Sequence, residues 1–112
     1  MAGFYYRDPH APTPNQPRRL GVAALIEHDG ELLLDKRRDP PAWALVAGAV
    51  LDTESLTDAL RREVEEETGL VVSGYELFGT FSDPARIVQY ADLNTYRFIT
   101  IVYCPPPRTE AT

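Results

Sequence analysis

The part of the chain that most restricts its fold is RREVEEETGL, residues 61–70, where four glutamates fall within five residues. Apolar residues recur one helical turn apart at Leu56, Leu60 and Val64, which makes them one stripe of an amphipathic helix. Gly69 stands where helices often end with a residue in the left-handed conformation. The sequence therefore predicts a helix that starts at Leu56, ends before Gly69 and packs its apolar stripe on the rest of the domain.

The glutamates of this helix do not all fit a simple solvated face. At about 100° per residue, Glu63 and Glu67 fall at about 340° and about 20° from Leu56, inside the apolar stripe. Glu66 lies at the edge of the stripe, and Glu65 points away from it. Like charges one turn apart repel, and burial adds a desolvation cost. Either these carboxylates hold a divalent cation such as Mg²⁺ or Mn²⁺, which favours oxygen ligands, or the helix end is a partly exposed acidic surface.

The rest of the chain predicts strands around this one helix. Residues 1–18 are rich in proline and polar groups and predict an extended arm before a folded domain over residues 19–112. Apolar runs separated by turn residues predict the strands. These runs are 19–37 with a hairpin turn at Asp29-Gly30, 43–46, 71–81 with a break near Gly74 or Gly79, 86–90, and 95–103. The fold class is therefore α+β, with an antiparallel or mixed sheet and one main helix.

Composition and charge narrow the possible functions. The 112 residues predict one domain, and no apolar run is long enough for a membrane span. A single cysteine, Cys104, and the absence of a signal-like start predict a cytoplasmic protein. The net charge of −6 argues against nucleic-acid binding. The segment from Gly48 to Leu70 holds seven acids and two bases, so it carries −5 of that charge.

The spacing of residues across this acidic segment is specific. It reads Gly48, five residues, Glu54, seven residues, Arg62-Glu63-Val64, one residue, Glu66-Glu67, one residue, Gly69-Leu70. This resembles the Nudix box, GX5EX7REUXEEXGU with U an aliphatic residue, at every specified position. The resemblance extends from about Arg18 to Cys104. It implies a Nudix-type α/β/α sandwich with a mixed sheet, from which the usual C-terminal strand and helix are missing here.

The resemblance also implies an activity and a set of site residues. Nudix enzymes hydrolyse a nucleoside diphosphate linked to another moiety, with the help of Mg²⁺ or Mn²⁺. By position, Glu63, Glu66 and Glu67 are the expected metal ligands, and one of them also acts as base. The carbonyl of Gly48 is a further expected ligand. Arg62 is expected to orient the carboxylates, to pair with Glu66 on the surface, or both. Glu54 is expected to support the site or to hold a further metal ion.

Two stretches around the box depart from the family pattern. The family commonly has W-x-L-P-G-G before the box, where this chain has Val46 and Ala47 at the proline and first glycine positions. Leu51 and Thr53 stand where the family commonly has glutamate and glycine. The helix therefore follows the pattern more closely than the loop before it.

The substrate is less constrained by the sequence than the chemistry is. Pro84 lies fourteen residues past Leu70, and a proline near there is associated with ADP-ribose pyrophosphatases, so ADP-ribose or a related sugar nucleotide is favoured. It is otherwise an ordinary loop proline. The alternatives are a MutT-like (d)NTP pyrophosphohydrolase and a nucleotide-binding module without turnover.

Other side chains are candidates for holding the substrate. The basic residues that could bind phosphates are Lys36, Arg37, Arg38 and Arg86, and the alternative is that they are ordinary solvated charges. The aromatic residues on which a base could stack are Tyr5, Tyr6, Trp43 and Tyr90, and the alternative is that they pack in the core. The strand over residues 96–103 carries apolar groups on both faces, and one face can pack on the helix. The other face needs a cover, which is either a second subunit, so that a homodimer is predicted, or the proline-rich N-terminal arm.

Overall fold

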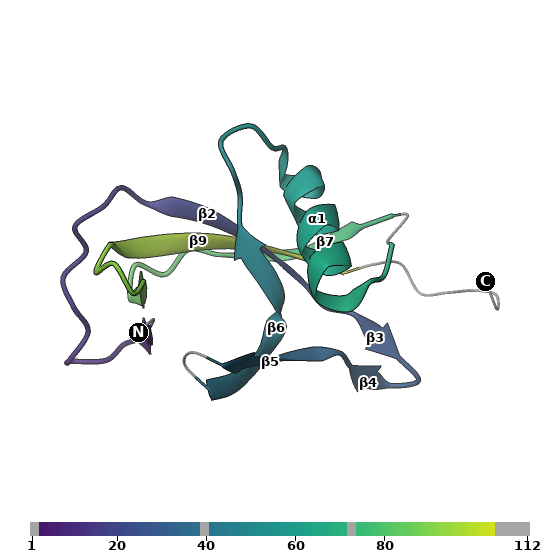
Figure 1. Cartoon of the computed structure of the whole chain (residues 1–112), viewed down its shortest axis with the longest axis horizontal. Helices are drawn as coiled ribbons and strands as arrows, with labels where there is room; N and C mark the ends of the chain where they lie inside the picture. The colour runs from purple at the N-terminus through teal and green to yellow at the C-terminus, as the bar shows by residue number, and fades with distance from the viewer. Residues whose placement is uncertain (1–2, 39–40, 72–73, 105–112) are drawn as a thin grey trace.

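A mixed, curled sheet of seven strands, within the described residues, carries one helix on one of its faces (Figure 1). The computed structural model describes residues 3–38, 41–71 and 74–104, and for residues 38 and 41 it describes the backbone only. The sheet strands are β1 Gly3–Tyr6, β2 Arg19–Ala24, β5 Leu34–Arg38, β6 Pro41–Ala49, β7 Glu76–Phe81, β8 Arg86–Gln89 and β9 Thr95–Cys104. A separate small ladder joins β3 Glu27–His28 to β4 Glu31–Leu32, and the helix is α1, Leu56–Thr68.

The order of the strands places β9 in the middle of the sheet. The order is β1-β8-β9-β2-β6-β5, and β7 also pairs with β9. The pair β2 and β9 is parallel, with Val22 opposite Ile101, and the other pairs are antiparallel. The first residues of β9 pair with β8 and its last residues pair with β7. This confirms the expected mixed sheet.

Helix α1 packs on β2 and β6 through the apolar stripe that the sequence predicted. Ala59, Leu60 and Val64 are buried together with Val22 and Val46. Full burial of a valine or leucine side chain contributes about 1.5–3 kcal/mol, so this contact is the main attachment of the helix. The described residues contain this one helix, on one face of the sheet, and none that is long and apolar enough to cross a membrane.

Both ends of α1 are fixed by local signals. The Ser55 hydroxyl accepts from the backbone N–H of Asp58, and the Asp58 carboxylate accepts from that of Ser55, which makes a capping box. At the other end Gly69 adopts φ 75° and donates its N–H to the carbonyl of Glu65. The helix bounds and the glycine cap are therefore confirmed.

The strand pairing differs in part from the prediction. Asp29 and Gly30 do form a turn, both with positive φ, but the turn joins only the short strands β3 and β4. The longer strands on either side, β2 and β5, do not pair with each other, because β6 lies between them. The strand expected over residues 71–81 begins only at Glu76, and residues 72–73 lie outside the described part of the chain. The break expected near Gly74 or Gly79 is a bulge between Leu77 and Gly79, and β8 pairs with β9 as predicted.

The N-terminal arm is part of the sheet. Residues 3–6 form β1, which pairs with β8 along its whole length. Further on, Asn15 donates its backbone N–H to the carbonyl of Thr95 and accepts from the N–H of Thr95 through its side chain. Sequence reasoning expected an extended arm here and missed the strand.

The glycine cap gives a test of the local account. An alanine at Gly69 must hold φ near 75°, where a β-carbon strains the backbone by about 1–2 kcal/mol. No atom lies within 4 Å of that β-carbon, so strain is the only cost. We expect Gly69→Ala to lower the free energy of unfolding by about 1 kcal/mol in urea denaturation. Gly69→Asn should lose less, and equal losses in the two variants would show that strain is not the cause.

Candidate functional site

Arg62 joins the loop after β6 to the acidic face of α1. Its Nε and one terminal nitrogen donate to the two carboxylate oxygens of Glu54 at 2.6 and 2.9 Å. The same terminal nitrogen donates to the carbonyl of Ala49 at 3.1 Å, and the other lies 2.6 Å from Glu63 and 3.5 Å from Glu66. The Glu54 contact is the largest cause that raises the Arg62 pKa, and it lowers the pKa of Glu54. Arg62 thus contacts Glu54 and Glu63 as well as Glu66, which is compatible with both of the roles expected for it.

Glu63 occupies space that only a glycine leaves open. A β-carbon added at Gly48 would lie 2.1–2.5 Å from the carboxylate atoms of Glu63, closer than any real contact. The Glu63 side chain is 14% exposed, so its carboxylate is held between β6 and Arg62. Gly48 therefore has a steric role in the site.

Glu67, one turn further along α1, lies near other acidic groups. Although the residue as a whole is exposed, its carboxylate faces the strands and accepts from the backbone of Ala47. Desolvation, and after it the nearby carboxylates of Asp35 and Glu63, raise the pKa of Glu67 to about 7. Arg37 acts in the opposite direction. The carboxylates at this end of the helix are therefore only partly neutralised by the basic group beside them.

The donors of this site suit a hard divalent cation, although they are not gathered around one point. In residues 3–38, 41–71 and 74–104 no three Asp, Glu, His or Cys side chains are close enough to form a metal cluster. Arg62 lies among Glu54, Glu63 and Glu66, and Glu66 is 58% exposed. All donors are carboxylate or carbonyl oxygens, the type that Mg²⁺ and Mn²⁺ prefer. The excess carboxylate charge near Glu67 also fits a cation.

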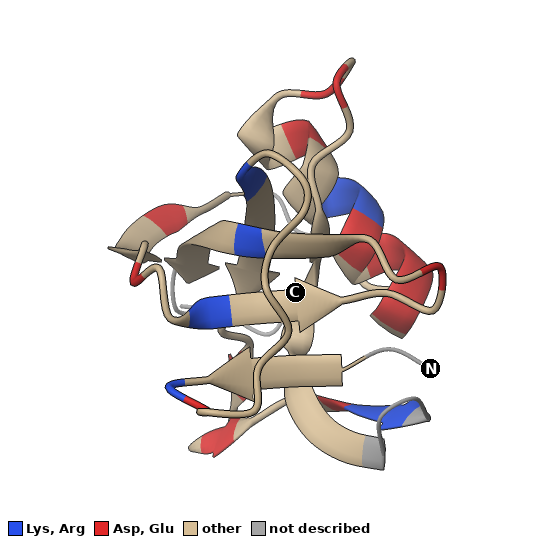
Figure 2. Ribbon diagram, turned by 90° about the vertical axis from the view of Figure 1, so that its left-hand side faces the viewer, with Lys and Arg blue, Asp and Glu red and all other residues tan. Residues whose placement is uncertain are grey.

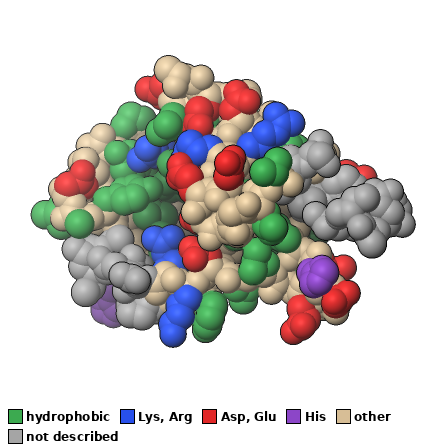
Figure 3. Space-filling view, turned by 45° about the vertical axis from the view of Figure 1, so that its right-hand side comes forward, with side chains coloured by type: hydrophobic (Ala, Val, Ile, Leu, Met, Phe, Trp, Pro, Cys, Tyr) green, Lys and Arg blue, Asp and Glu red, His purple; other side chains and the backbone are tan. Residues whose placement is uncertain are grey.

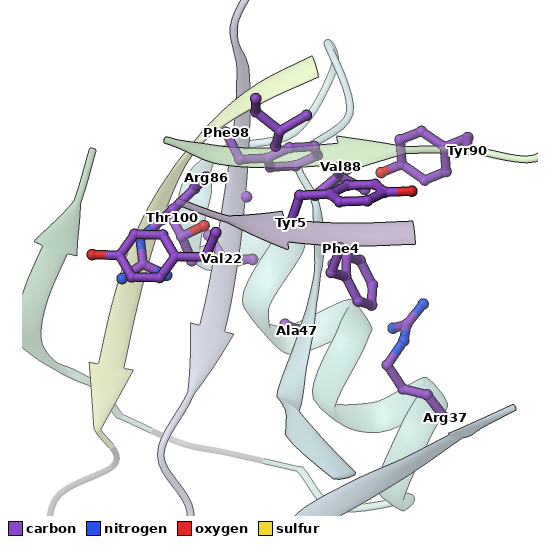
Figure 4. A pocket seen from close by; sticks show the side chains of 15 residues that line it. Phe4, Tyr5, Val22, Arg37, Ala47, Arg86, Val88, Tyr90, Phe98 and Thr100 are labelled. Carbon is purple, nitrogen blue, oxygen red and sulfur yellow. The ribbon is translucent and has the colours of Figure 1, made fainter. Parts of the chain in front are cut away.

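A pocket of about 370 Å³ lies on the concave side of the curled sheet (Figure 4). Its floor comes from β2, β6 and β9, and its walls include β1 and β8. The lining residues are mostly apolar and aromatic, with Arg37 and Arg86 at opposite ends in Figure 4. Gly48 contributes to the pocket as well as to the carboxylate site. Strand β6 thus separates the pocket from the glutamates of α1.

Helix α1 carries charged side chains of both signs. In Figure 2, α1 carries acidic and basic residues, and acidic residues dominate its C-terminal end. Figure 3 shows acidic and basic side chains side by side on one face of the molecule.

The structure brings some of the expected substrate-binding residues together and leaves others apart. Arg86, Arg37, Tyr5, Tyr6 and Tyr90 all line the pocket. Three other candidates, Lys36, Trp43 and Pro84, do not line it. The exposed Trp43 instead lies under Lys36, and the carbonyl of Pro84 accepts from Arg97. The Arg38 side chain lies outside the described part of the chain.

Sequence reasoning missed two residues that the structure places at the site. Phe4 lines the pocket from β1, and Asp35 on β5 is next to Glu67. Successive side chains of a strand point to opposite faces, so Asp35 and Arg37 share a face and Lys36 lies on the other. This alternation was the signal in the sequence that could have found Asp35. Phe4 carried no such signal, because its pairing partner lies more than eighty residues away.

The chain matches known proteins over most of its length. The NUDIX domain family model matches residues 17–110. The nucleoside triphosphatase NudI of Escherichia fergusonii is 41% identical over 93 residues, which cover 77% of this chain and 64% of the relative. NudI of Salmonella agona is 43% identical over 82 residues, 67% of this chain and 57% of the relative. The chain thus spans less than two thirds of the length of these relatives.

Solved structures agree with this match. A MutT Nudix hydrolase from Burkholderia pseudomallei superimposes with a TM-score of 0.65 at 30% identity, covering 81% of this chain and 67% of that one. The Nudix domain of Shewanella oneidensis NrtR, in complex with ADP ribose, has a TM-score of 0.63 at 26% identity, covering 93% and 68%. A MutT protein from Methanosarcina mazei has a TM-score of 0.65 at 27% identity, covering 88% and 70%.

If Glu63 is a metal ligand, the contact between Gly48 and Glu63 predicts a defect in metal binding. In Gly48→Ala the new β-carbon must displace the Glu63 carboxylate. Because this moves one of the expected ligands, we expect Gly48→Ala to bind Mn²⁺ more weakly than the wild type in calorimetric titration. Gly79→Ala is the matched control, because its β-carbon makes only ordinary contacts at 3.6 and 3.8 Å. Unchanged Mn²⁺ affinity in Gly48→Ala would refute the steric role.

The raised pKa of Glu67 predicts how stability depends on pH without metal. The carboxyl binds its proton more tightly in the folded chain, with a pKa of about 7, than at its ordinary value of 4.5 in the unfolded chain. Its contribution to stability is therefore complete below about pH 4.5 and is lost as the pH rises through about 7. In the presence of a chelator, we expect the midpoint of thermal denaturation to fall as the pH rises from about 5 to about 8.

Two variants isolate the contribution of Glu67 to that loss. Glu67→Gln should lose less stability than the wild type over the same pH range, and the exposed Glu65→Gln should follow the wild type. A wild-type slope that persists in Glu67→Gln would assign the effect to other groups.

Proposed function

Because the chain belongs to the Nudix family, we propose that it hydrolyses the pyrophosphate bond of a nucleoside diphosphate derivative with the help of Mg²⁺ or Mn²⁺. The observation that carries the proposal is the cluster around Arg62, where Glu54, Glu63 and Glu66 lie 2.6–3.5 Å from one guanidinium. A solvated acidic face would not need this cluster or the space that Gly48 leaves for Glu63.

The side chains of the site have distinct roles in this proposal. Glu63, Glu66 and Glu67 bind the cation, with the carbonyl of Gly48 as a further donor. Arg62 keeps Glu63 in place and binds Glu54, which in turn accepts from the backbone of Leu51. When bound, the cation neutralises phosphoryl oxygens and lowers the pKa of water.

The reaction requires one proton acceptor and one leaving group. Water attacks a phosphorus of the pyrophosphate, one of the three glutamates accepts its proton, and the bridging P–O bond breaks. The leaving oxygen departs with the rest of the phosphate chain or with the second moiety. A nucleoside triphosphate would give a nucleoside monophosphate and pyrophosphate.

We place nucleoside triphosphates first among the substrates and ADP-ribose second. The relatives that are 41–43% identical are named nucleoside triphosphatases. The structure with ADP ribose supports the second candidate at 26% identity. Pro84, the residue that favoured ADP-ribose in the sequence, is exposed and does not line the pocket. A panel of (d)NTPs and ADP-ribose with Mg²⁺, assayed for released nucleoside monophosphate, decides between the two, and no hydrolysis of any of them would favour a binding module.

Loss of a single metal ligand should stop turnover on the substrate that the panel identifies. We expect Glu66→Gln and Glu67→Gln to lower kcat by at least about 10²–10³-fold while the circular dichroism spectrum is retained, since even one lost transition-state donor costs that much. Glu65→Gln is the control, because Glu65 lies on the exposed side of the same helix. Near-normal kcat in both ligand variants, with unchanged metal affinity, would remove these two residues from the site.

We also propose that the protein forms a homodimer. Large apolar side chains are exposed after α1 and on β7, with Val71 at 79%, Leu77 at 63% and Phe78 at 61%. Exposed apolar patches larger than a few hundred Å² are uncommon on monomers. We expect light scattering at micromolar concentration to give twice the mass of 12.5 kDa. Phe78→Asp should shift this value towards the monomer, and a concentration-independent monomer mass in the wild type would contradict the proposal.

A further inference from the structure

The two ends of the sheet meet over the concave pocket. Strands β1 and β5 stand at opposite ends of the strand order, yet the guanidinium of Arg37 on β5 lies 4.5 Å from the ring centre of Phe4 on β1. The curl of the sheet makes this contact possible. The contact closes the pocket on the side where Arg37 also faces Glu67.

Strand β1 is held in this position by several contacts. It pairs with β8 from Gly3 opposite Gln89 to Tyr6 opposite Arg86. Just after it, Arg7 pairs with Asp83 at 3.2 Å, and the Tyr6 hydroxyl donates to the same carboxylate at 3.3 Å. The strand precedes residue 17, where the match to the NUDIX domain begins. A pocket wall built from β1 therefore lies outside the residues that the family model matches.

The two arginines of the pocket have donors that the protein does not use. The Nε atoms of Arg37 and Arg86 are buried, and neither has a hydrogen-bond partner among the described residues. Each guanidinium lies over aromatic rings, Arg37 over Phe4 and Arg86 over Tyr6 and Phe81. Rings fix the plane of a guanidinium without using its N–H groups. Because the two Nε atoms are buried, a ligand in the pocket can reach only the terminal nitrogens of the two arginines.

Size and lining indicate what the pocket can hold. A volume of about 370 Å³ is near the lower end of the range for small-molecule sites, so the pocket takes one part of a nucleotide and not a whole dinucleotide. Phe4, Tyr5, Tyr90 and Phe98 give it aromatic surface, on which any nucleobase can stack. The N–H groups of Arg86 suit carbonyl or ring-nitrogen acceptors on the edge of a base.

We propose that β1 completes a nucleobase-binding pocket on the concave face, and that Arg37 holds a substrate phosphate between this pocket and the glutamates of α1. This inference rests on the proposed function for the identity of the ligand as a nucleotide. The base stacks on the aromatic lining, the N–H groups of Arg86 bind its edge, and Phe4 keeps Arg37 in place. The N-terminal strand then determines affinity for the nucleoside part.

Binding without metal separates this proposal from hydrolysis. Calorimetric titration in EDTA compares the four ribonucleoside monophosphates with ribose 5-phosphate, which lacks the base. We expect at least one monophosphate to bind about tenfold or more tightly than ribose 5-phosphate, as stacking of one base provides. Equal affinity for all five compounds, or no binding of any monophosphate at millimolar concentration, would overturn the proposal.

Phe4 variants test the contribution of β1. Phe4→Ala should weaken the preferred monophosphate by about five- to a hundredfold and remove most of its advantage over ribose 5-phosphate. Phe4→Tyr keeps the ring and should bind like the wild type. Trp43→Ala is the matched control, since Trp43 is also an exposed aromatic residue but lies on β6 and does not line the pocket. Wild-type affinity in a folded Phe4→Ala variant would exclude β1 as a pocket wall.

Arg37→Gln provides a second test that does not depend on the Phe4 variants folding. It should weaken ribose 5-phosphate and the monophosphates by similar factors, because it removes the phosphate contact. Arg61→Gln, on the exposed side of α1, is its control and should change neither affinity. If Arg37→Gln binds both ligands as the wild type does, the phosphate role of Arg37 is excluded.

Hydrolysis by the wild type is scored separately. If the wild type hydrolyses a substrate with Mg²⁺ but binds the monophosphates no more tightly than ribose 5-phosphate, the proposed function stands and the pocket proposal is wrong. If binding depends on the Phe4 ring but no substrate is hydrolysed, the pocket proposal stands and the proposed function is wrong.

Discussion

The bidentate ion pair between Arg62 and Glu54 is the interaction on which the rest of the site depends. It joins a loop residue to the helix eight residues later, and the same guanidinium reaches the carbonyl of Ala49 at the end of β6. Only a planar guanidinium can meet both oxygens of one carboxylate and still donate to other groups. It also places one positive charge among carboxylates that would otherwise repel one another. The position of α1 against β6 therefore decides the position of the glutamates.

Strand β6 gives the sheet two different faces at one place. On the helix side, the missing side chain of Gly48 leaves room for Glu63. On the concave side, Ala47 and Ala49 line the pocket with small side chains. A ligand in the pocket and a cation on the glutamates are then separated by little more than one strand. Arg37 belongs to both regions, since it faces Glu67 and contacts Phe4.

The features that the sequence predicted well are those with local causes. The bounds of α1 were predicted from a repeating apolar stripe and a terminal glycine, and the spacing of the box also lies within one segment. The structure adds a serine cap at the other end of the helix, within the same fifteen residues. The pairing of β2 with β6 and β9, in contrast, depends on residues far apart in the chain. The Asp29-Gly30 turn gave a correct local signal but could not show that β6 would separate the two longer strands. For the same reason β1 and the contact of Phe4 with Arg37 could not be predicted.

The most direct test of this account is the affinity of Mn²⁺ for the wild type and for Arg62→Lys, measured by calorimetric titration. Lysine keeps the charge but cannot hold both oxygens of Glu54 together with the carbonyl of Ala49. If Arg62 positions the metal-binding glutamates, the variant should stay folded and bind Mn²⁺ about 10–100-fold more weakly, as expected when groups that orient metal ligands are changed. Equal affinity in the two proteins, or no Mn²⁺ binding by the wild type, would contradict the central claim.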